Sequence, residues 1–277
     1  MNKDHFIKGL KGNAETDKKG IKKNVPIKRW NIAQDSEAVY WNSFSTKSLL
    51  QESSGKYPFK VKYLLKEWSK YIKINKNTKI LQIGCGPEDV INYFPYGKLY
   101  SIDPLADFYK KKFKFDYKKS NLIQGTGENL PYKREFFDIV ILTNVLDHTH
   151  LPETVLLEVS RVLKKNGIFH FENYFYQKRF LQIAKIWKPV KRTFTGKMFN
   201  IHHPYTFTLN DLKKIINKNF IVLQEEIGKD IGSYENLEET KKNLKKEKRL
   251  TVRIPAMFNL LGSINYMSIS KKGVMSK

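Results

Sequence analysis

The segment ILQIGCGPE, residues 80–88, joins an apolar run to a turn that contains two glycines. An apolar run of this length, ended by glycine and proline, indicates a buried strand followed by a tight turn. Gly84 and Gly86 carry no Cβ atom, so the backbone can bend sharply there and a ligand can approach it closely. We expect a helix to begin after Pro87 and to offer its free N–H groups to a carboxylate or a phosphate.

Asp103 ends the next predicted strand, about twenty residues after the glycines, where a carboxylate can bind both hydroxyls of a ribose. A dinucleotide turn of the G-x-G-x-x-G type would need a glycine at position 89, where the chain has Asp89. A negative side chain next to a pyrophosphate is unfavourable. The sequence therefore disfavours NAD and favours a nucleotide that carries a carboxylate, an ammonium and a sulfonium. The alternative is that Gly84 and Gly86 belong to an ordinary turn and that Asp103 is exposed to solvent at the end of its strand.

Short apolar segments alternate with helical patterns from residue 57 onward. The predicted strands are residues 79–84, 98–103, 121–125, 136–143 and 167–173, and the clearest helices are residues 59–72 and 152–165. Such alternation predicts an α/β fold, with a mostly parallel sheet that has helices on both faces. Ligands of these sheets bind beyond the carboxyl ends of the strands. A capped helix and strand over residues 208–226 and a last strand over residues 264–272 complete the pattern.

Composition limits the class of protein. A chain of 277 residues with 40% hydrophobic residues can bury one substantial core, and it contains no apolar run long enough to cross a bilayer. The first twenty residues contain no apolar stretch typical of a secretion signal. Cys85 is the single cysteine, so no intrachain disulfide can form and a reducing compartment fits. We expect a cytoplasmic protein.

The chain is strongly basic, with 51 Lys and Arg against 27 Asp and Glu and a formal net charge of +24. Such a balance attracts polyanions and anionic membrane surfaces. Almost all of the positive charge is lysine, however, and arginine, which binds phosphate with a planar fork, is scarce. An AT-rich genome produces the same lysine-rich bias, so the charge alone does not identify a nucleic-acid substrate.

The pattern divides the chain into three parts. Residues 1–28 are expected to form a mobile basic arm, and residues 29–56 a helical cap segment whose aromatic residues either pack on the core, as we expect, or cover a substrate. Residues 57–277 form the main domain. Within it, residues 174–205 contain basic and aromatic residues and no Asp or Glu, which predicts a lid insertion over the acceptor site.

Four segments together resemble the class I methyltransferases that use S-adenosylmethionine (SAM), of the small-molecule, type 11-like kind. They are ILQIGCGPE, LYSIDP (99–104), the stretch from QGTGENLP to FHFEN (124–173) and HHPYTFTLNDLKKII (202–216). The resemblance covers residues 57–225. It implies a Rossmann-like seven-stranded sheet with a reversed last strand, which matches residues 264–270, and SAM as the cofactor.

The resemblance also assigns roles to individual residues. The implied cofactor-binding residues are Gly84, Cys85, Gly86, Asp103, Pro104, Thr126, Gly127, Glu128 and Asn144. In it, Gly84 and Gly86 face the methionine part of SAM, and Asp103 binds the ribose. The loop that begins at Thr126 reads the adenine, although the family often has Asp at that position. Asn144 lies near the methionine part, and Asp147 and His148 match the acidic-His pair just beyond it.

Methyl transfer needs a general base only when the acceptor atom must lose a proton. The candidate catalytic residues are His148, Asp147 and His203, with His202 beside the last. Each histidine also has a structural interpretation, because His148 can cap a helix and residues 202–204 can form a turn. No group of Cys, His and Asp has metal-ligand spacing along the chain, so no metal site is predicted.

The acceptor is harder to predict. Enzymes that methylate exocyclic amines of nucleic acids usually have an Asn/Asp-Pro-Pro-aromatic segment after the fourth strand, where this chain has TNVLDH (143–148). Enzymes that methylate C5 of cytosine need a nucleophilic cysteine, and Cys85 belongs to the donor loop. We expect a small-molecule or saccharide acceptor, neutral or anionic, methylated on oxygen. RNA methylation, peripheral membrane contact and a non-catalytic partner subunit stay open, as does the oligomeric state.

Overall fold

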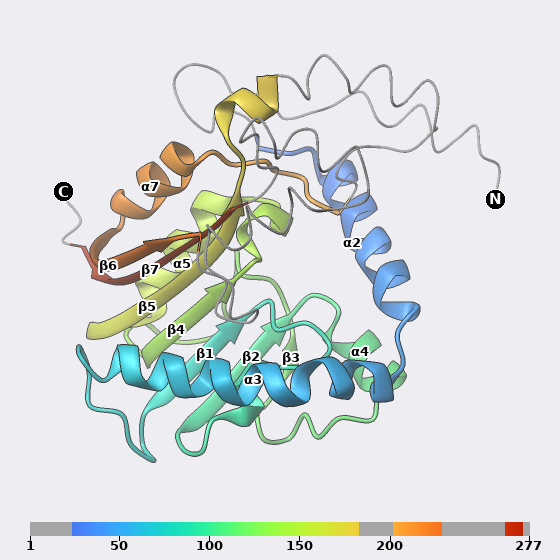
Figure 1. The fold of residues 1–277 in the computed structure, drawn as a ribbon, viewed down its shortest axis with the longest axis horizontal. Coiled ribbons are helices and arrows are strands. Elements are labelled where there is room, and N and C mark those ends of the chain that lie inside the picture. The colour runs from blue at the N-terminus through green and yellow to red at the C-terminus, as the bar shows by residue number, and fades with distance from the viewer. Residues whose placement is uncertain (1–23, 183–201, 229–263, 274–277) are drawn as a thin grey trace, which may run out of the picture.

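The computed structural model describes residues 24–182, 202–228 and 264–273. Its centre is a seven-stranded sheet with the order β3-β2-β1-β4-β5-β7-β6 (Figure 1). The strands are β1 (Lys79–Ile83), β2 (Lys98–Asp103), β3 (Ile123–Gln124), β4 (Phe137–Thr143), β5 (Leu163–Phe175), β6 (Phe220–Ile227) and β7 (Ile264–Lys272). Neighbouring strands from β3 to β5 are parallel, whereas β7 runs antiparallel to β5 and to β6. The predicted Rossmann-like sheet with a reversed last strand is confirmed.

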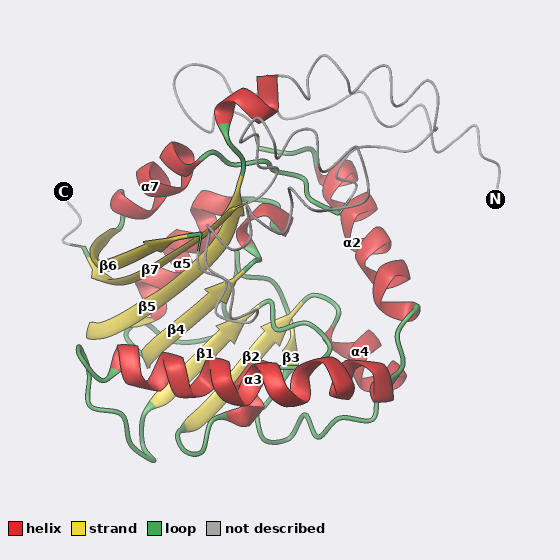
Figure 2. Ribbon diagram, viewed as in Figure 1, coloured by secondary structure: helices red, strands yellow, loops and turns green. Residues whose placement is uncertain are grey.

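Helices cover both faces of the sheet (Figure 2). On one face, α5 (Pro152–Val162) and α7 (Leu209–Asn217) pack against alternate residues of the central strands, including Leu81 and Val140. On the other face, α3 (Thr46–Trp68) packs against the residues in between, such as Ile80 and Ile139. The central strands are therefore buried on both sides, which explains why they read as continuous apolar runs.

The helix expected after Pro87 is absent, and this part of the prediction is wrong. The structure has only a four-residue 3-10 helix, η1 (Val90–Tyr93), before β2 begins at Lys98. Pro95 and Gly97 leave no room for a longer helix, because proline cannot donate an N–H and restricts the residue before it. α3 covers this region instead, and its Trp68 stacks on Phe94 with ring centroids 5.5 Å apart.

The segment before the sheet consists of two helices. α2 (Ile27–Asn42) follows Pro26, and α3 begins after a capping box in which Ser45 and Ser48 bond each other's backbone N–H. α3 continues to Trp68 and so crosses the boundary expected between residues 56 and 57. Residues 1–23 of the expected basic arm lie outside the described residues.

The other predicted elements differ from the structure mainly at their ends. The helix expected over residues 152–165 ends at Val162, because residues 163–165 already belong to β5. α7 begins after a capping box formed by Thr208 and Asp211, as its pattern predicted. Most of the expected lid, residues 183–201, lies outside the described residues. Within the described ranges, no helix has the length and apolarity that crossing a membrane requires.

Candidate functional site

The glycine turn after β1 has the backbone that its sequence predicted. Gly84 and Gly86 adopt left-handed conformations, with φ of 65° and 68°. A Cβ atom added at Gly84 would lie 2.4 Å from a methyl group of Val145, so this glycine allows close packing. A Cβ added at Gly86 would meet nothing within 4 Å, because this residue borders a cavity.

Asp103 lies directly against this turn. The backbone N–H of Gly86 donates to its Oδ2 at 3.0 Å, and that of Leu105 donates to its Oδ1 at 2.8 Å. Burial raises the pKa of the Asp103 carboxyl to about 6, and these two hydrogen bonds oppose the shift. The bend and the carboxylate thus meet at the carboxyl ends of β1 and β2, as expected from a parallel pair.

A cavity of about 490 Å³ opens at this edge of the sheet. Of the predicted site residues, it is lined by Gly84, Gly86, Asp103, Pro104, Gly127, Glu128, Asn144, His148 and His203. Thr126 does not line this cavity. Glu128 has a structural task as well, because its Oε1 accepts hydrogen bonds from the N–H groups of His150 and Leu151, just before α5.

A second cavity of about 320 Å³ lies on the other side of the glycine turn. Both cavities share Tyr40, Trp41, Gly84, Gly86 and Asn144 in their linings. Cys85 lines only the second one, where burial raises the pKa of its thiol. The two cavities therefore meet at the bend that the sequence singled out.

Asn144 stands at the junction of the two cavities. It follows the last residue of β4, and its φ of 55° is unusual for a residue with a side chain. Its backbone N–H donates to the carbonyl of Glu172 at 2.8 Å. Its buried Oδ1 has no hydrogen-bond partner among the described residues. Strained backbone and an unpaired buried oxygen are typical of ligand-binding positions.

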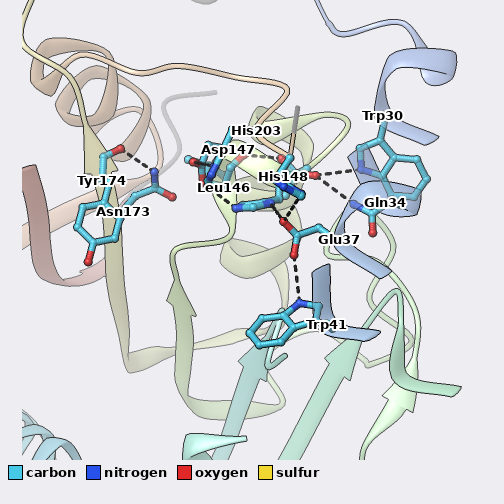
Figure 3. Close-up of polar contacts among 12 residues, drawn as sticks. Trp30, Gln34, Glu37, Trp41, Leu146, Asp147, His148, Asn173, Tyr174 and His203 are labelled. Atoms are coloured by element: carbon cyan, nitrogen blue, oxygen red, sulfur yellow. Dashed lines mark hydrogen bonds and ion pairs between the residues drawn. The ribbon is translucent and has the colours of Figure 1, made fainter. Parts of the chain in front are cut away.

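The three predicted catalytic residues come together (Figure 3), and His148 and His203 line the first cavity. Nδ1 of His203 lies 2.7 Å from Oδ2 of Asp147, and the rings of His148 and His203 have centroids 4.3 Å apart. Tyr205 positions this loop, because its backbone N–H donates to the carbonyl of Asp147 at 3.2 Å. Although burial alone would raise the pKa of Asp147, His148 and His203 lower it.

α2 adds residues that the sequence analysis missed. Glu37 places Oε1 3.4 Å from Nδ1 of His148 and 3.5 Å from Nδ1 of His202. Trp30 donates its indole N–H to the carbonyl of His148 at 3.0 Å, and Trp41 donates to Glu37 at 3.1 Å (Figure 3). α2 therefore covers the first cavity, and its Trp41 also packs against a buried cluster, so the cap segment both covers the site and packs on the core.

A buried ion pair borders the second cavity. Lys60 of α3 lies 2.9 Å from Glu172 at the end of β5, and only 11% and 3% of the two side chains are exposed. Nε2 of His170 lies 2.7 Å from the other oxygen of Glu172, and Trp68 donates to Nδ1 of His170. Although burial alone would raise the pKa of Glu172, Lys60 and His170 hold it at about 2.

Asp89 does not have the surroundings assumed in the argument against NAD. It is completely buried, lines neither cavity, and accepts hydrogen bonds from the hydroxyl of Ser101 and the N–H of Ile91. Burial raises its pKa to about 7. The residue therefore supports the short 3-10 helix and does not face a ligand, so Asp89 gives no reason to disfavour NAD.

Comparison with known proteins gives the family of this site. Residues 81–171, from β1 to β5, match the model of a family described as a methyltransferase domain. The solved structure of a putative methyltransferase from Bacillus halodurans covers 76% of this chain and 99% of its own, with a TM-score of 0.50 and 17% identity. The chain contains a methyltransferase domain, and its fold is that of the class I methyltransferases. The glycine turn, Asp103 and the loop of His148 all lie in the matched part of this methyltransferase domain.

A second solved structure has the same fold. Geranyl diphosphate C-methyltransferase from Streptomyces coelicolor, in complex with Mg²⁺, geranyl diphosphate and S-adenosyl-L-homocysteine, has a TM-score of 0.52. It is 9% identical and covers 76% of this chain and 79% of that one. At such identities the likeness shows the fold of the methyltransferase domain and leaves the acceptor open.

Relatives of known sequence differ in what they methylate. An uncharacterized methyltransferase of Schizosaccharomyces pombe is 30% identical over 112 residues, and a thiol S-methyltransferase of Mus musculus is 32% identical over 102. A sterol 24-C-methyltransferase of Candida albicans is 29% identical over 107 residues. The matches cover 34–35% of this chain and 40%, 42% and 28% of those proteins. The chain thus spans less than half the length of each of these relatives.

Proposed function

We propose that the protein transfers a methyl group from SAM to a small-molecule or saccharide acceptor. The observation that carries the proposal is the hydrogen bond between Gly86 and Asp103 at the wall of the first cavity. This contact places a bare backbone bend beside a carboxylate that still has lone pairs for the two ribose hydroxyls. The methyltransferase family of residues 81–171 supports the same donor.

The second cavity suits the methionine end of the donor. No α-helix begins after Pro87, and the first turn of the short η1 is capped by Asp89, so the free N–H groups expected for the methionine carboxylate are missing there. Lys56 and Lys60 of α3 line this cavity and offer cationic groups in their place. Glu52 and Glu88 also line it and offer anionic groups to the ammonium. The unpaired Oδ1 of Asn144, at the junction of the cavities, is a further acceptor for that ammonium.

Methyl transfer is an in-line displacement. A lone pair of the acceptor oxygen forms the bond to the methyl carbon while the carbon–sulfur bond breaks, and its electron pair neutralises the sulfonium. The acceptor proton must leave, and the group of Asp147, His148 and His203 at the first cavity is placed to assist its removal. Positioning of the two reactants and exclusion of water from the site supply the rest of the rate acceleration.

The acceptor site is proposed beneath α2. Trp30, Tyr40 and Trp41 line the cavity with aromatic faces, which stack well on sugars and other flat or apolar surfaces. The thiol and sterol methyltransferases among the relatives show that related domains serve small acceptors. The single Cys85 supports a cytoplasmic location, which fractionation of cells would test.

The test is transfer of isotopically labelled methyl from SAM to phenols, thiols, sugar nucleotides and tRNA. We expect label in a small-molecule fraction. If the label appeared only in tRNA, the proposed small-molecule acceptor would be wrong and RNA would be the acceptor. Binding of SAM without transfer to any acceptor would instead support a non-catalytic partner subunit.

A further inference from the structure

Asp147, His148 and His203 form a group that could bind a metal ion. One oxygen or nitrogen atom from each lies within 4.8 Å of the others. The residues come from two segments, the loop after β4 and the turn before α7, so their spacing along the chain did not reveal the group. His148 and His203 also line the first cavity, so the group faces the space proposed for the acceptor.

We infer that these three residues bind a divalent metal ion that activates the acceptor. The inference rests on the proposed function and deepens it, because it names how the acceptor proton is removed. Two imidazoles and one carboxylate are ligands that suit zinc and its neighbours Co²⁺ and Fe²⁺, whereas Mg²⁺ and Ca²⁺ prefer oxygen. Three protein ligands beside a cavity leave a coordination position for the acceptor, as in catalytic zinc sites.

The three ligand atoms lie within 4.8 Å of one another, so a single bound ion would draw them closer together. Bonds of about 2.1 Å in tetrahedral geometry place two ligand atoms about 3.4 Å apart. In the structure, Oδ2 of Asp147 lies 2.7 Å from Nδ1 of His203, and the other oxygen of the same carboxylate, Oδ1, lies 3.9 Å from Nε2 of His148.

Glu37 strengthens the inference independently. While Nε2 of His148 faces Asp147, its Nδ1 lies 3.4 Å from Oε1 of Glu37, and the indole of Trp41 donates to Oε2. A metal-bound histidine commonly donates its other N–H to a carboxylate, which fixes the ring and its tautomer. The chain Trp41–Glu37–His148 has this arrangement (Figure 3).

A bound ion would act as a Lewis acid. An acceptor hydroxyl or thiol that coordinates the ion loses its proton at lower pH, since the ion stabilises the anion. The anion then attacks the methyl carbon, and the proton passes to water. Acceptors with a hydroxyl or thiol are therefore favoured over amines.

Cobalt is the probe for this site. The protein is dialysed against EDTA, then titrated with Co²⁺ while its visible absorption is followed, and zinc content is measured after incubation with Zn²⁺. We expect one equivalent to bind. His148→Asn and His203→Asn should abolish binding, and Glu37→Gln should weaken it by about 10–100-fold. His150→Asn is the matched control, because this nearby histidine is outside the group and should leave binding unchanged.

Calorimetry with SAM on the same samples separates the two proposals. Variants that still bind SAM are folded, so their loss of cobalt reports on the ligands alone. SAM binding with no cobalt binding, or cobalt binding that His148→Asn and His203→Asn do not reduce, would overturn the metal inference and leave the proposed function standing. Cobalt binding without SAM binding would overturn the proposed function instead.

Discussion

Gly84 and Gly86 share a left-handed backbone but have different surroundings. Gly84 is packed against Val145, which belongs to the loop after β4, so it helps to hold two loops of the site together. Gly86 borders open space and donates its N–H to Asp103. The first glycine is therefore required for packing, and the second for access of a ligand to the backbone.

Alanine substitutions should separate these two tasks. Gly84→Ala adds a methyl group that overlaps Val145, so we expect a loss of roughly 2–5 kcal/mol in the free energy of unfolding, from strain and overpacking together. Gly86→Ala meets no neighbour and should lose only about 1–2 kcal/mol, from its backbone conformation. Urea denaturation measures both. Equal losses would show that the two positions do not differ in packing.

The raised pKa of Asp103 predicts that stability and SAM affinity depend on pH. Burial raises its pKa to about 6 from an ordinary value of 3.8, so the folded protein binds a proton there that the unfolded chain has already released. Its contribution to stability is complete below pH 3.8 and is lost as the pH rises through 6. The ionised form, which is the one proposed to accept both ribose hydroxyls, increases over the same range. SAM affinity should therefore rise about tenfold between pH 5 and pH 7.

Asp103→Asn serves as the control for this pH effect, because an amide does not titrate. Its SAM affinity, measured by calorimetry at the same pH values, should be weaker and nearly flat. A rise with pH that persists in the variant would assign the effect to another group.

Site residues could be predicted from the sequence where their role depends on neighbouring residues in the chain. The bend at Gly84 and Gly86 and the acid at Asp103 follow from strand ends and glycine spacing. Glu37 was not found, because its role depends on a helix that docks from a distant part of the chain. Trp30, Gln34, Glu37 and Trp41 do recur at helical spacing, and that single face was the signal available.

At the scale of elements, α3 replaces the helix that usually follows a glycine turn. Its residues Val61, Leu64 and Trp68 pack on the face that the short η1 leaves uncovered. The same helix brings Lys60 to Glu172 at the end of β5. The amphipathic pattern of α3 is visible in the sequence, but its position on the sheet is not, because it depends on η1 being too short to cover that face.

Lys60→Met should destabilise the fold. It leaves the carboxylate of Glu172 buried without its cation, so we expect the free energy of unfolding to fall by about 3–5 kcal/mol at pH 7. Lys56→Met, one turn earlier and half-buried in the same helix, is the control and should change stability by about 0.5 kcal/mol or less. Thermal and chemical denaturation of both variants measure the difference. Similar stabilities would mean that the Lys60–Glu172 pair is not stabilising.

For the whole molecule, the α/β class with a mostly parallel sheet was predictable from the alternation of apolar strands and helices, and the seven strands with a reversed last one followed from the family resemblance. The acceptor was not, since it depends on how α2 and the histidine loop meet above the sheet. The high positive charge does not identify the acceptor, because a lysine-rich composition has causes other than ligand binding.

Salt dependence tests whether that charge serves nucleic acid. We expect tRNA and duplex DNA to bind weakly at low salt and to dissociate near about 0.15 M salt, because only general attraction holds them. Filter binding or fluorescence anisotropy over a salt series measures this. Tight binding of one RNA at about 0.15 M salt would favour the RNA methyltransferase alternative.

The most direct test of the account is calorimetric titration of the protein, and of Asp103→Ala, with SAM and with S-adenosylhomocysteine. We predict that the unaltered protein binds both ligands and that the substitution weakens binding by about 1–3 kcal/mol, since buried hydrogen bonds to the ribose are lost. Absence of binding to the unaltered protein, or equal affinity in Asp103→Ala, would contradict the assignment of this cavity to the methyl donor.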